Sequence, residues 1–249
     1  MNPLLKELLD EKRTLLESGD YVEMTSHIDH ECGLLLQKAI RDLRPKMALE
    51  VGLAYGMSTL YILEALEENG GQKLIGMDPA QHDGYWRGGG LHNIRRAGYG
   101  HLYEFHENTS QQILPKLAGE GQRIDFAFID GWHTFDHALV DFFYIDQMLN
   151  IGGIVVFDDV GYPSIRRLCE FVVTNRDYLF YDAVRRDMGN SLNRTIKKYF
   201  RNALRPLWRT DKTPTSESSE KIVRISDAYF LALTKTGDDK RRWDHFVQF

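Results

Sequence analysis

Cysteine is scarce in this chain, and long apolar runs are missing from it. The 249 residues include two cysteines, Cys32 and Cys169, which stand far apart and match neither a metal-binding nor a redox spacing. We therefore expect two ordinary buried thiols and a reducing compartment. No apolar run reaches the length of a membrane span, and charges follow the N-terminus too closely for a secretory signal. These features predict a cytoplasmic protein with no membrane partner.

A strong charge of either sign is also missing. The formal net charge is −5, which gives no general attraction to nucleic acid or to anionic membranes. No nucleic-acid-binding module and no internal repeat can be recognised, so a nucleic-acid partner is not expected. The length suits one large α/β domain with appendages better than two equal domains.

Short apolar runs alternate with amphipathic segments along the middle of the chain. The candidate strands are residues 47–51, 73–77, 102–106, 124–129 and 154–157. The candidate helices between them are residues 58–66, 91–97, 110–117 and 134–149. This alternation predicts a doubly wound, Rossmann-like α/β fold with a mostly parallel sheet.

The remaining segments are predicted to flank or interrupt this core. Leucines between Leu4 and Leu16 predict a first amphipathic helix, and residues 28–43 predict a second. A helix over 165–175 and strands over 178–184 and 223–233 follow the alternating part. The predicted organisation is an N-terminal helical segment (1–44), a core (45–184 and 222–236), an insertion (185–221) and a C-terminal tail (237–249).

The insertion is basic, with nine lysines and arginines and two aspartates between residues 185 and 212. It begins with a candidate amphipathic helix, and residues 213–219 are polar and are expected to be flexible. Two interpretations remain open. The insertion could attract a phosphorylated or nucleotide-linked acceptor or cover the active site; the preferred alternative is a solvated helix that packs on the sheet or on a partner subunit. A homo-oligomer is therefore left open.

Two apolar runs end abruptly on acidic residues. Asp130 and His133 follow the run that ends at residue 129, and Asp158 and Asp159 follow the run that ends at residue 157. The carboxyl ends of neighbouring parallel strands face one crevice, so these side chains are expected to converge there. A divalent ion such as Mg²⁺ would compensate the repulsion between the carboxylates. The alternative is structural, with aspartates that cap the next turns and a histidine bonded to backbone.

The first predicted strand leads into a glycine turn. A dinucleotide fingerprint fails here because Ala54 and Met57 stand where its second and third glycines would be. The pattern that remains joins Glu50, Gly52, Gly56 and Ser58. Asp78 follows the second strand, where an acidic residue commonly binds the hydroxyls of a ribose. Together they favour a nucleoside cofactor, although a plain tight turn and a turn-forming aspartate are the alternatives.

These residues carry a family resemblance. Glu50–Ser58, Asp78 and the strand end at Asp130 resemble class I S-adenosylmethionine-dependent methyltransferases, and the nearer match is the metal-dependent O-methyltransferases of catechols and antibiotic sugars. The resemblance implies a seven-stranded sheet whose last strand is antiparallel. It also implies cofactor-binding roles. Glu50, Gly52 and Gly56 would border the methionine part, Asp78 would hold the ribose, and residues 108–110, beginning with Asn108, would lie near the adenine. Ser58, which starts the following helix, and Asp130 are the other candidate cofactor-binding residues.

The resemblance also implies a reaction. Asp130, Asp158 and Asp159 would bind Mg²⁺ or Mn²⁺, and His133 would be the general base that deprotonates a hydroxyl of a small molecule such as a sugar, diol or catechol. His137 is a second candidate base, whereas Asp136 and Asp141 are expected on the helix surface. Two alternatives stay open, a metal-independent N- or carboxyl-methyltransferase and a non-catalytic cofactor-binding subunit.

A loop rich in glycine and aromatic residues, 81–90, follows the ribose acid. It could close over the cofactor, with Tyr85 or Trp86 as the covering ring. An ordinary mobile surface loop is an equal alternative.

Overall fold

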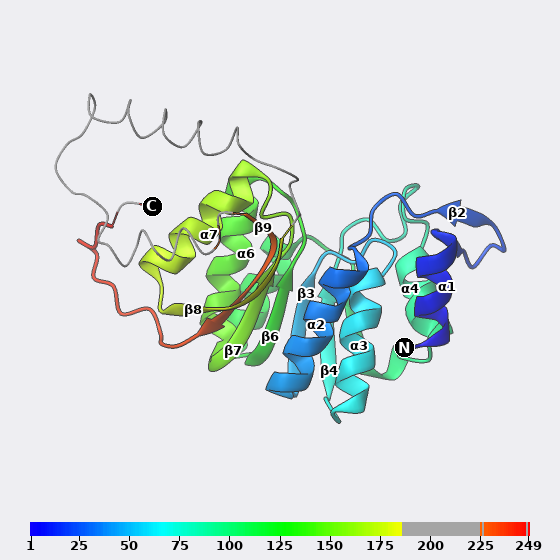
Figure 1. The fold of residues 1–249 in the computed structure, drawn as a ribbon, viewed down its shortest axis with the longest axis horizontal. Helices are drawn as coiled ribbons and strands as arrows, with labels where there is room; N and C mark the ends of the chain where they lie inside the picture. Colours follow the sequence, from blue (N-terminus) through cyan, green and yellow to red (C-terminus); the bar gives the residue numbers. More distant parts are fainter. Residues whose placement is uncertain (186–224, 226, 248) are drawn as a thin grey trace.

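The computed structural model describes residues 1–185, 225, 227–247 and 249. A twisted seven-stranded sheet occupies the centre, with helices on both faces (Figure 1). The predicted basic insertion lies outside the described residues except for Arg185. None of the described helices is both long and apolar enough to cross a membrane.

Strands and helices alternate through most of the chain. The strands are β1 (Arg13–Leu15), β2 (Tyr21–Glu23), β3 (Met47–Val51), β4 (Lys73–Met77), β5 (Tyr103–His106), β6 (Ile124–Ile129), β7 (Leu149–Phe157), β8 (Tyr178–Arg185) and β9 (Ala228–Lys235). The helices are α1 (Pro3–Glu11), α2 (His30–Leu43), α3 (Met57–Glu68), α4 (Gly89–Arg96), α5 (Ser110–Gly119), α6 (Phe135–Met148) and α7 (Pro163–Asn175), with a 3₁₀ turn at Gly100–Leu102.

The large sheet has the order β5-β4-β3-β6-β7-β9-β8. Strands β3 to β7 pair in parallel, and β9 pairs antiparallel with both β7 and β8. The direction in which the strands are added reverses at β3, because β4 and β5 lie on one side of it and β6 and β7 on the other. In open α/β sheets such a switch point opens a crevice at the carboxyl ends of the strands. The predicted fold class, including the antiparallel last strand, is confirmed.

Side chains along each strand alternate between two separate cores. In β6, Phe126 and Phe128 join the cluster under α2 and α3, whereas Ala127 and Ile129 join the cluster under α6 and α7. This is the period of two that a pleated strand imposes. Burial on both faces explains why the strands appear in the sequence as continuous apolar runs.

The N-terminal segment differs from the prediction. Helix α1 ends at Glu11, since Lys12 takes a left-handed conformation (φ 53°) and its backbone N–H bonds to the Leu8 carbonyl. The prediction that the helix extends to Leu16 is therefore wrong. Residues 13–15 form β1 and pair with β2 in a short antiparallel hairpin. Cys32 and Cys169 are free and buried, as expected.

Candidate functional site

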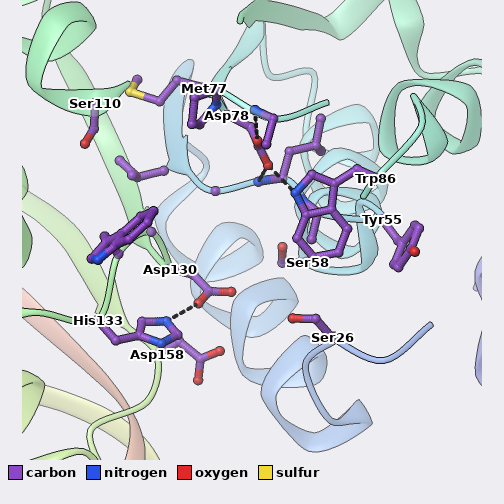
Figure 2. A pocket seen from close by; sticks show the side chains of 18 of the residues that line it. Ser26, Tyr55, Ser58, Met77, Asp78, Trp86, Ser110, Asp130, His133 and Asp158 are labelled. Atoms are coloured by element: carbon purple, nitrogen blue, oxygen red, sulfur yellow. Dashed lines mark hydrogen bonds and ion pairs between the residues drawn. The ribbon is translucent and has the colours of Figure 1, made fainter. Parts of the chain in front are cut away.

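A cavity of about 670 Å³ opens at the carboxyl ends of the central strands. It lies at the switch point of the sheet, where the turns after β3, β4, β6 and β7 meet. Figure 2 shows Asp130, His133 and Asp158 together in one part of it, and Met77, Asp78 and Ser110 in another. The cavity therefore joins the predicted nucleoside site to the predicted acidic site.

The turn after β3 needs glycine for a steric reason. Gly52 has a φ of +93°, and a Cβ added there would lie 2.1 Å from the carbonyl oxygen of Asp130. The N–H of Asp130 in turn donates to the Val51 carbonyl (3.0 Å). Gly56 also has a positive φ (+79°) and stands at the N-terminus of α3. Gly52 thus lets the turn after β3 lie directly against the acidic loop after β6.

Glu50 is fully buried beneath this turn. Its two carboxylate oxygens accept hydrogen bonds from the hydroxyls of Ser58 and Thr59, each at 2.6 Å. Burial, together with the negative charges of Asp130 and Asp78, raises the pKa of Glu50 to about 8. Glu50 therefore ties the strand to the start of α3 and supports the cavity from behind, whereas Ser58 lines it.

Asp78 holds the same turn from the side of β4. Its Oδ2 accepts hydrogen bonds from the backbone N–H groups of Leu53 (3.1 Å) and Ala54 (3.0 Å), and its Oδ1 accepts one from Ala80 (2.8 Å). The side chain of Gln81 donates to the Ala54 carbonyl (2.8 Å) and to Asp78 (3.3 Å). Asp78 is thus fixed at the cavity wall by the loops that it joins.

The acidic part of the site is built around one imidazole. The Nε2 atom of His133 lies 3.4 Å from Oδ1 of Asp130 and 3.3 Å from Oδ2 of Asp159. One ligand atom from each of these three residues lies within 4.8 Å of the others. Asp158 lines the same cavity, and its Oδ1 accepts the N–H of Asp159 (2.7 Å).

Backbone geometry and a neighbouring helix hold this cluster in place. Asp159 has a positive φ (53°), a conformation that aspartate tolerates better than most residues. The Ser164 hydroxyl donates to the backbone carbonyl of His133 (2.6 Å), and the ring of Tyr162 stacks on the imidazole at 5.5 Å between centroids. The turn after β7 thereby orients His133, which comes from the turn after β6.

The carboxylates are close enough to disturb one another. Burial, together with the negative charges of Asp130 and Asp159, raises the pKa of Asp158 to about 8. Burial likewise raises the pKa of Asp130, while the hydrogen bond to Asp130 raises the pKa of His133. Positive charge is therefore favoured here, whether it comes from an imidazolium or from a cation.

The aromatic loop after β4 covers part of the cavity. Trp86 lines it and contacts Tyr55 edge to face, with 5.1 Å between the ring centroids. Tyr85 is 61% exposed, and its hydroxyl lies 3.3 Å from that of Thr25. Arg87 pairs with Asp20 of the turn between β1 and β2 (2.8 Å). The loop is thus attached to the N-terminal segment.

Most of the predicted site residues line the cavity. They are Gly52, Ser58, Asp78, Asp130, His133, Asp158 and Asp159. Glu50, Gly56 and Asn108 do not line it; Asn108 accepts the N–H of Thr109 instead (2.8 Å), and Thr109, Ser110 and Gln111 form the wall. Sequence reasoning missed the wall formed by Thr25, Ser26 and His27, because a short irregular loop carries no periodic signal.

Asp141 corrects another expectation. It was expected on the surface of its helix, but it is 1% exposed and lies on the buried face of α6 with Ala138, Phe142 and Ile145. The spacing of these residues at three and four positions is that of one helix face. Asp136 is exposed, as expected.

Known proteins resemble both the sequence and the fold. A protein-family model described as a methyltransferase domain matches residues 49–160. Tapetum-specific methyltransferase 1 of Arabidopsis thaliana is 31% identical over 157 residues, which are 63% of each chain. Caffeoyl-CoA O-methyltransferase of Petroselinum crispum is 25% identical over 190 residues, 71% of this chain and 73% of the relative. The first two curated relatives are matched over less than two thirds of their length, 63% and 62%.

Solved structures share the fold across nearly the whole chain. An O-methyltransferase from Bacillus cereus, in complex with S-adenosylhomocysteine, has a TM-score of 0.63 at 15% identity and covers 94% of this chain and 92% of its own. The O-methyltransferase TomG from Streptomyces achromogenes, in complex with S-adenosylmethionine, has a TM-score of 0.62 at 18% identity, with coverage of 95% and 91%.

Proposed function

We propose that this chain transfers a methyl group from S-adenosylmethionine to a hydroxyl of a small molecule, with the help of a divalent cation. Its motifs predict a class I S-adenosylmethionine-dependent methyltransferase domain. The observation that carries the proposal is the continuity of one cavity. It runs from the glycine turn and Asp78, suited to a nucleoside, to the acidic cluster around His133. Relatives named caffeoyl-CoA O-methyltransferase support the same chemistry.

The donor set of the acidic cluster fits a hard divalent cation. Asp130, Asp158 and Asp159 offer carboxylate oxygens, and Asp130 and Asp159 lie with His133 in a group compact enough to share one ion. The pKa of Asp158 is raised first by burial and then by the negative charges of Asp130 and Asp159, so a bound cation would stabilise its charged form. A bound Mg²⁺ or Mn²⁺ would supply Lewis acidity, lowering the pKa of an acceptor hydroxyl at the cluster.

The residues of this chain then have distinct tasks. The glycine turn lets the cofactor approach the acidic loop closely, and Asp78 orients the ribose. His133 accepts the proton of the acceptor hydroxyl, and Asp130 stabilises the imidazolium that results. Bound S-adenosylmethionine would supply the methyl group, which would pass from its sulfonium to the acceptor oxygen and leave a neutral thioether.

We infer that the acceptor carries two neighbouring oxygen groups. Two adjacent oxygens can share one cation with the carboxylates, and such chelation fixes the reacting oxygen in position. Sugars, aliphatic diols and catechols all have this feature. A histidine at position 133 suits an acceptor whose hydroxyl needs a base near neutral pH.

A labelled-methyl assay over sugars, catechols and nucleotide-linked diols tests the proposal, with and without EDTA. We expect transfer that EDTA abolishes and that Mg²⁺ or Mn²⁺ restores. The variants Asp158→Ala and Asp159→Ala should bind the cation weakly in calorimetry, whereas Asp136→Ala on the exposed face of α6 should behave as the unmodified chain does. Full activity of Asp158→Ala in excess EDTA would contradict the metal mechanism.

One observation favours a second candidate, a metal-independent methyltransferase that acts on a nitrogen or a carboxyl group. The imidazole of His133 lies within 3.4 Å of two carboxylates, so its protonated form could compensate their charge without an ion. In that case calorimetry with the cofactor present should show no heat on addition of Mg²⁺ or Mn²⁺. Transfer to an amine or carboxylate acceptor should then persist in EDTA.

A further inference from the structure

Ala54 has an unfavourable backbone conformation in the turn after β3. Its φ is +46°, in the left-handed region that residues other than glycine rarely adopt. Gly52 and Gly56 of the same turn also have positive φ values, but glycine has no Cβ to clash. A strained residue of this kind persists only where its surroundings impose the conformation, and such residues cluster at ligand-binding sites. Ala54 lines the cavity, so the contacts that hold it determine the shape of the turn.

Two buried amide side chains hold the carbonyl groups of this turn. Nε2 of Gln81 donates to the Ala54 carbonyl (2.8 Å), and Nδ2 of Asn93 donates to the Tyr55 carbonyl (3.0 Å). Both amide residues are 0% exposed, and neither lines the cavity. They therefore do not contact a ligand in the cavity themselves and can act on it only through the backbone of the turn.

Asp78 holds the other side of the same peptide. Its Oδ2 accepts the N–H of Ala54 (3.0 Å) and also the side-chain amide of Gln81 (3.3 Å). Figure 2 shows Asp78 beside the turn, with its hydrogen bonds drawn as dashed lines. Because the N–H and the carbonyl of Ala54 are both bonded, a rotation of its backbone out of the left-handed region would break at least one of these bonds.

The N-terminal segment orients the second amide. Thr14 of β1 is fully buried, and its hydroxyl donates to Oδ1 of Asn93 (2.8 Å). Since the amide oxygen accepts this bond, the amide nitrogen is directed toward Tyr55. The start of α4 also lies directly against the turn, because a Cβ added to Gly90 would be 2.5 Å from the Ala54 carbonyl oxygen. The hairpin and α4 therefore support the turn together.

We propose that Gln81 and Asn93 are positioning residues that keep Ala54 in its left-handed conformation, so that the turn is preformed for the cofactor. This inference rests on the proposed function, in which the turn binds S-adenosylmethionine. Without the amides the turn would populate a second conformation, and the apparent affinity would fall in proportion to the fraction of chains that can bind. The loss would come from the conformation of Ala54 and not from a missing contact with the ligand.

Calorimetry with S-adenosylhomocysteine measures the first effect. Gln81→Leu removes the donor to the Ala54 carbonyl and should weaken binding by about three- to tenfold. Gln37→Leu is the matched control, because Gln37 is also a buried amide but donates to Glu64 between α2 and α3. This control should lower the thermal stability and leave the affinity for S-adenosylhomocysteine unchanged.

A second substitution separates positioning from a merely structural role. Glycine adopts the left-handed region more readily than alanine, so Ala54→Gly should favour the binding conformation. Added to Gln81→Leu, it should recover about three- to fivefold in affinity. The same substitution in the unmodified chain should give a smaller gain, because the amides already fix the turn there. Asn93→Ala, which releases the neighbouring carbonyl, should respond to Ala54→Gly as Gln81→Leu does.

An unchanged affinity in a folded Gln81→Leu would overturn the proposal. Equal gains from Ala54→Gly with and without Gln81→Leu would overturn it as well, and Asn93→Ala gives the same comparison if Gln81→Leu does not fold. Methyl transfer is measured separately. Rescue by Ala54→Gly in a chain with no transfer activity would support this inference while contradicting the proposed function, and active transfer without rescue would do the reverse.

Discussion

Gly52 lies so close to Asp130 that no side chain fits between them. A Cβ at Gly52 would come within 2.1 Å of the Asp130 carbonyl oxygen, and the φ of +93° is itself unfavourable for other residues. The turn that would bind the cofactor and the loop that carries the acidic cluster therefore share one backbone contact. A side chain at position 52 would therefore displace both halves of the site.

Gly52→Ala should consequently disturb stability and binding together. We expect a loss of more than about 2 kcal/mol in the free energy of unfolding, from strain and from the displaced loop. Binding of S-adenosylhomocysteine should fall by more than tenfold, on the order of the 1.4 kcal/mol that tenfold represents. Urea denaturation and calorimetry measure the two effects.

Gly70→Ala is the matched control for this substitution. Gly70 also has a positive φ (+68°), but a Cβ there would meet nothing within 4 Å. Its loss of stability should stay near the roughly 1 kcal/mol of the backbone conformation alone, with ligand binding unchanged. Equal effects of the two substitutions would show that the contact with Asp130 is unimportant.

Asp78 should show a similar double effect, for another reason. It accepts the N–H groups of Leu53, Ala54 and Ala80, so Asp78→Ala leaves three donors without their acceptor. We expect a loss of about 1–3 kcal/mol in unfolding free energy and a loss of ligand affinity. Asp78→Asn keeps one acceptor oxygen and should retain more of the stability than of the affinity. Full affinity in Asp78→Ala would contradict the predicted ribose contact.

The sequence predicted the parts of this molecule that depend on local patterns. Strands β3, β4 and β6 were predicted at their observed bounds, because each is a short apolar run buried on both faces. The glycine turn, Asp78 and the acidic residues followed from their positions at strand ends. The family model of a methyltransferase domain matches residues 49–160, where these motifs lie.

The errors fall where tertiary contacts decide. The hairpin of β1 and β2 has only three residues in each strand, so Leu15 was assigned to the preceding leucine-rich helix. At Asp141 the helical period with Ala138, Phe142 and Ile145 indicated the buried face, but the charge suggested the surface. The helical period was therefore the better guide to the burial of Asp141.

Glu50 gives a prediction about pH. Its pKa is about 8 in the folded chain and near 4.5 when exposed, so between these values the folded chain binds more protons than the unfolded chain. Stability should therefore decline as the pH rises from 4.5 to 8, by as much as a few kcal/mol. Glu50→Gln removes this titration. The unfolding free energy of the variant should therefore rise relative to that of the unmodified chain as the pH increases over the same range.

Thermal unfolding of both proteins in EDTA, without cofactor, measures this difference. Glu68→Gln is the control, because the Glu68 side chain is 47% exposed and pairs with Arg41 at the surface. The difference between Glu50→Gln and the unmodified chain should level off above pH 8. A constant difference from pH 4.5 to 8 would show that Glu50 ionises normally.

Trp86 and Tyr85 provide a matched pair for the aromatic loop. Trp86 lines the cavity and packs against Tyr55, whereas Tyr85 is mostly exposed and contacts Trp86 from outside. Trp86→Ala should therefore weaken binding of S-adenosylhomocysteine by about 10- to 100-fold, since a large aromatic contact is lost. Tyr85→Ala should change the affinity by less than about threefold, because substitutions at exposed positions usually have small effects. Fluorescence titration is unsuitable for a tryptophan variant, so calorimetry measures both. If the two variants bind equally well, the loop does not cover the cofactor and the interpretation as a surface loop is the better one.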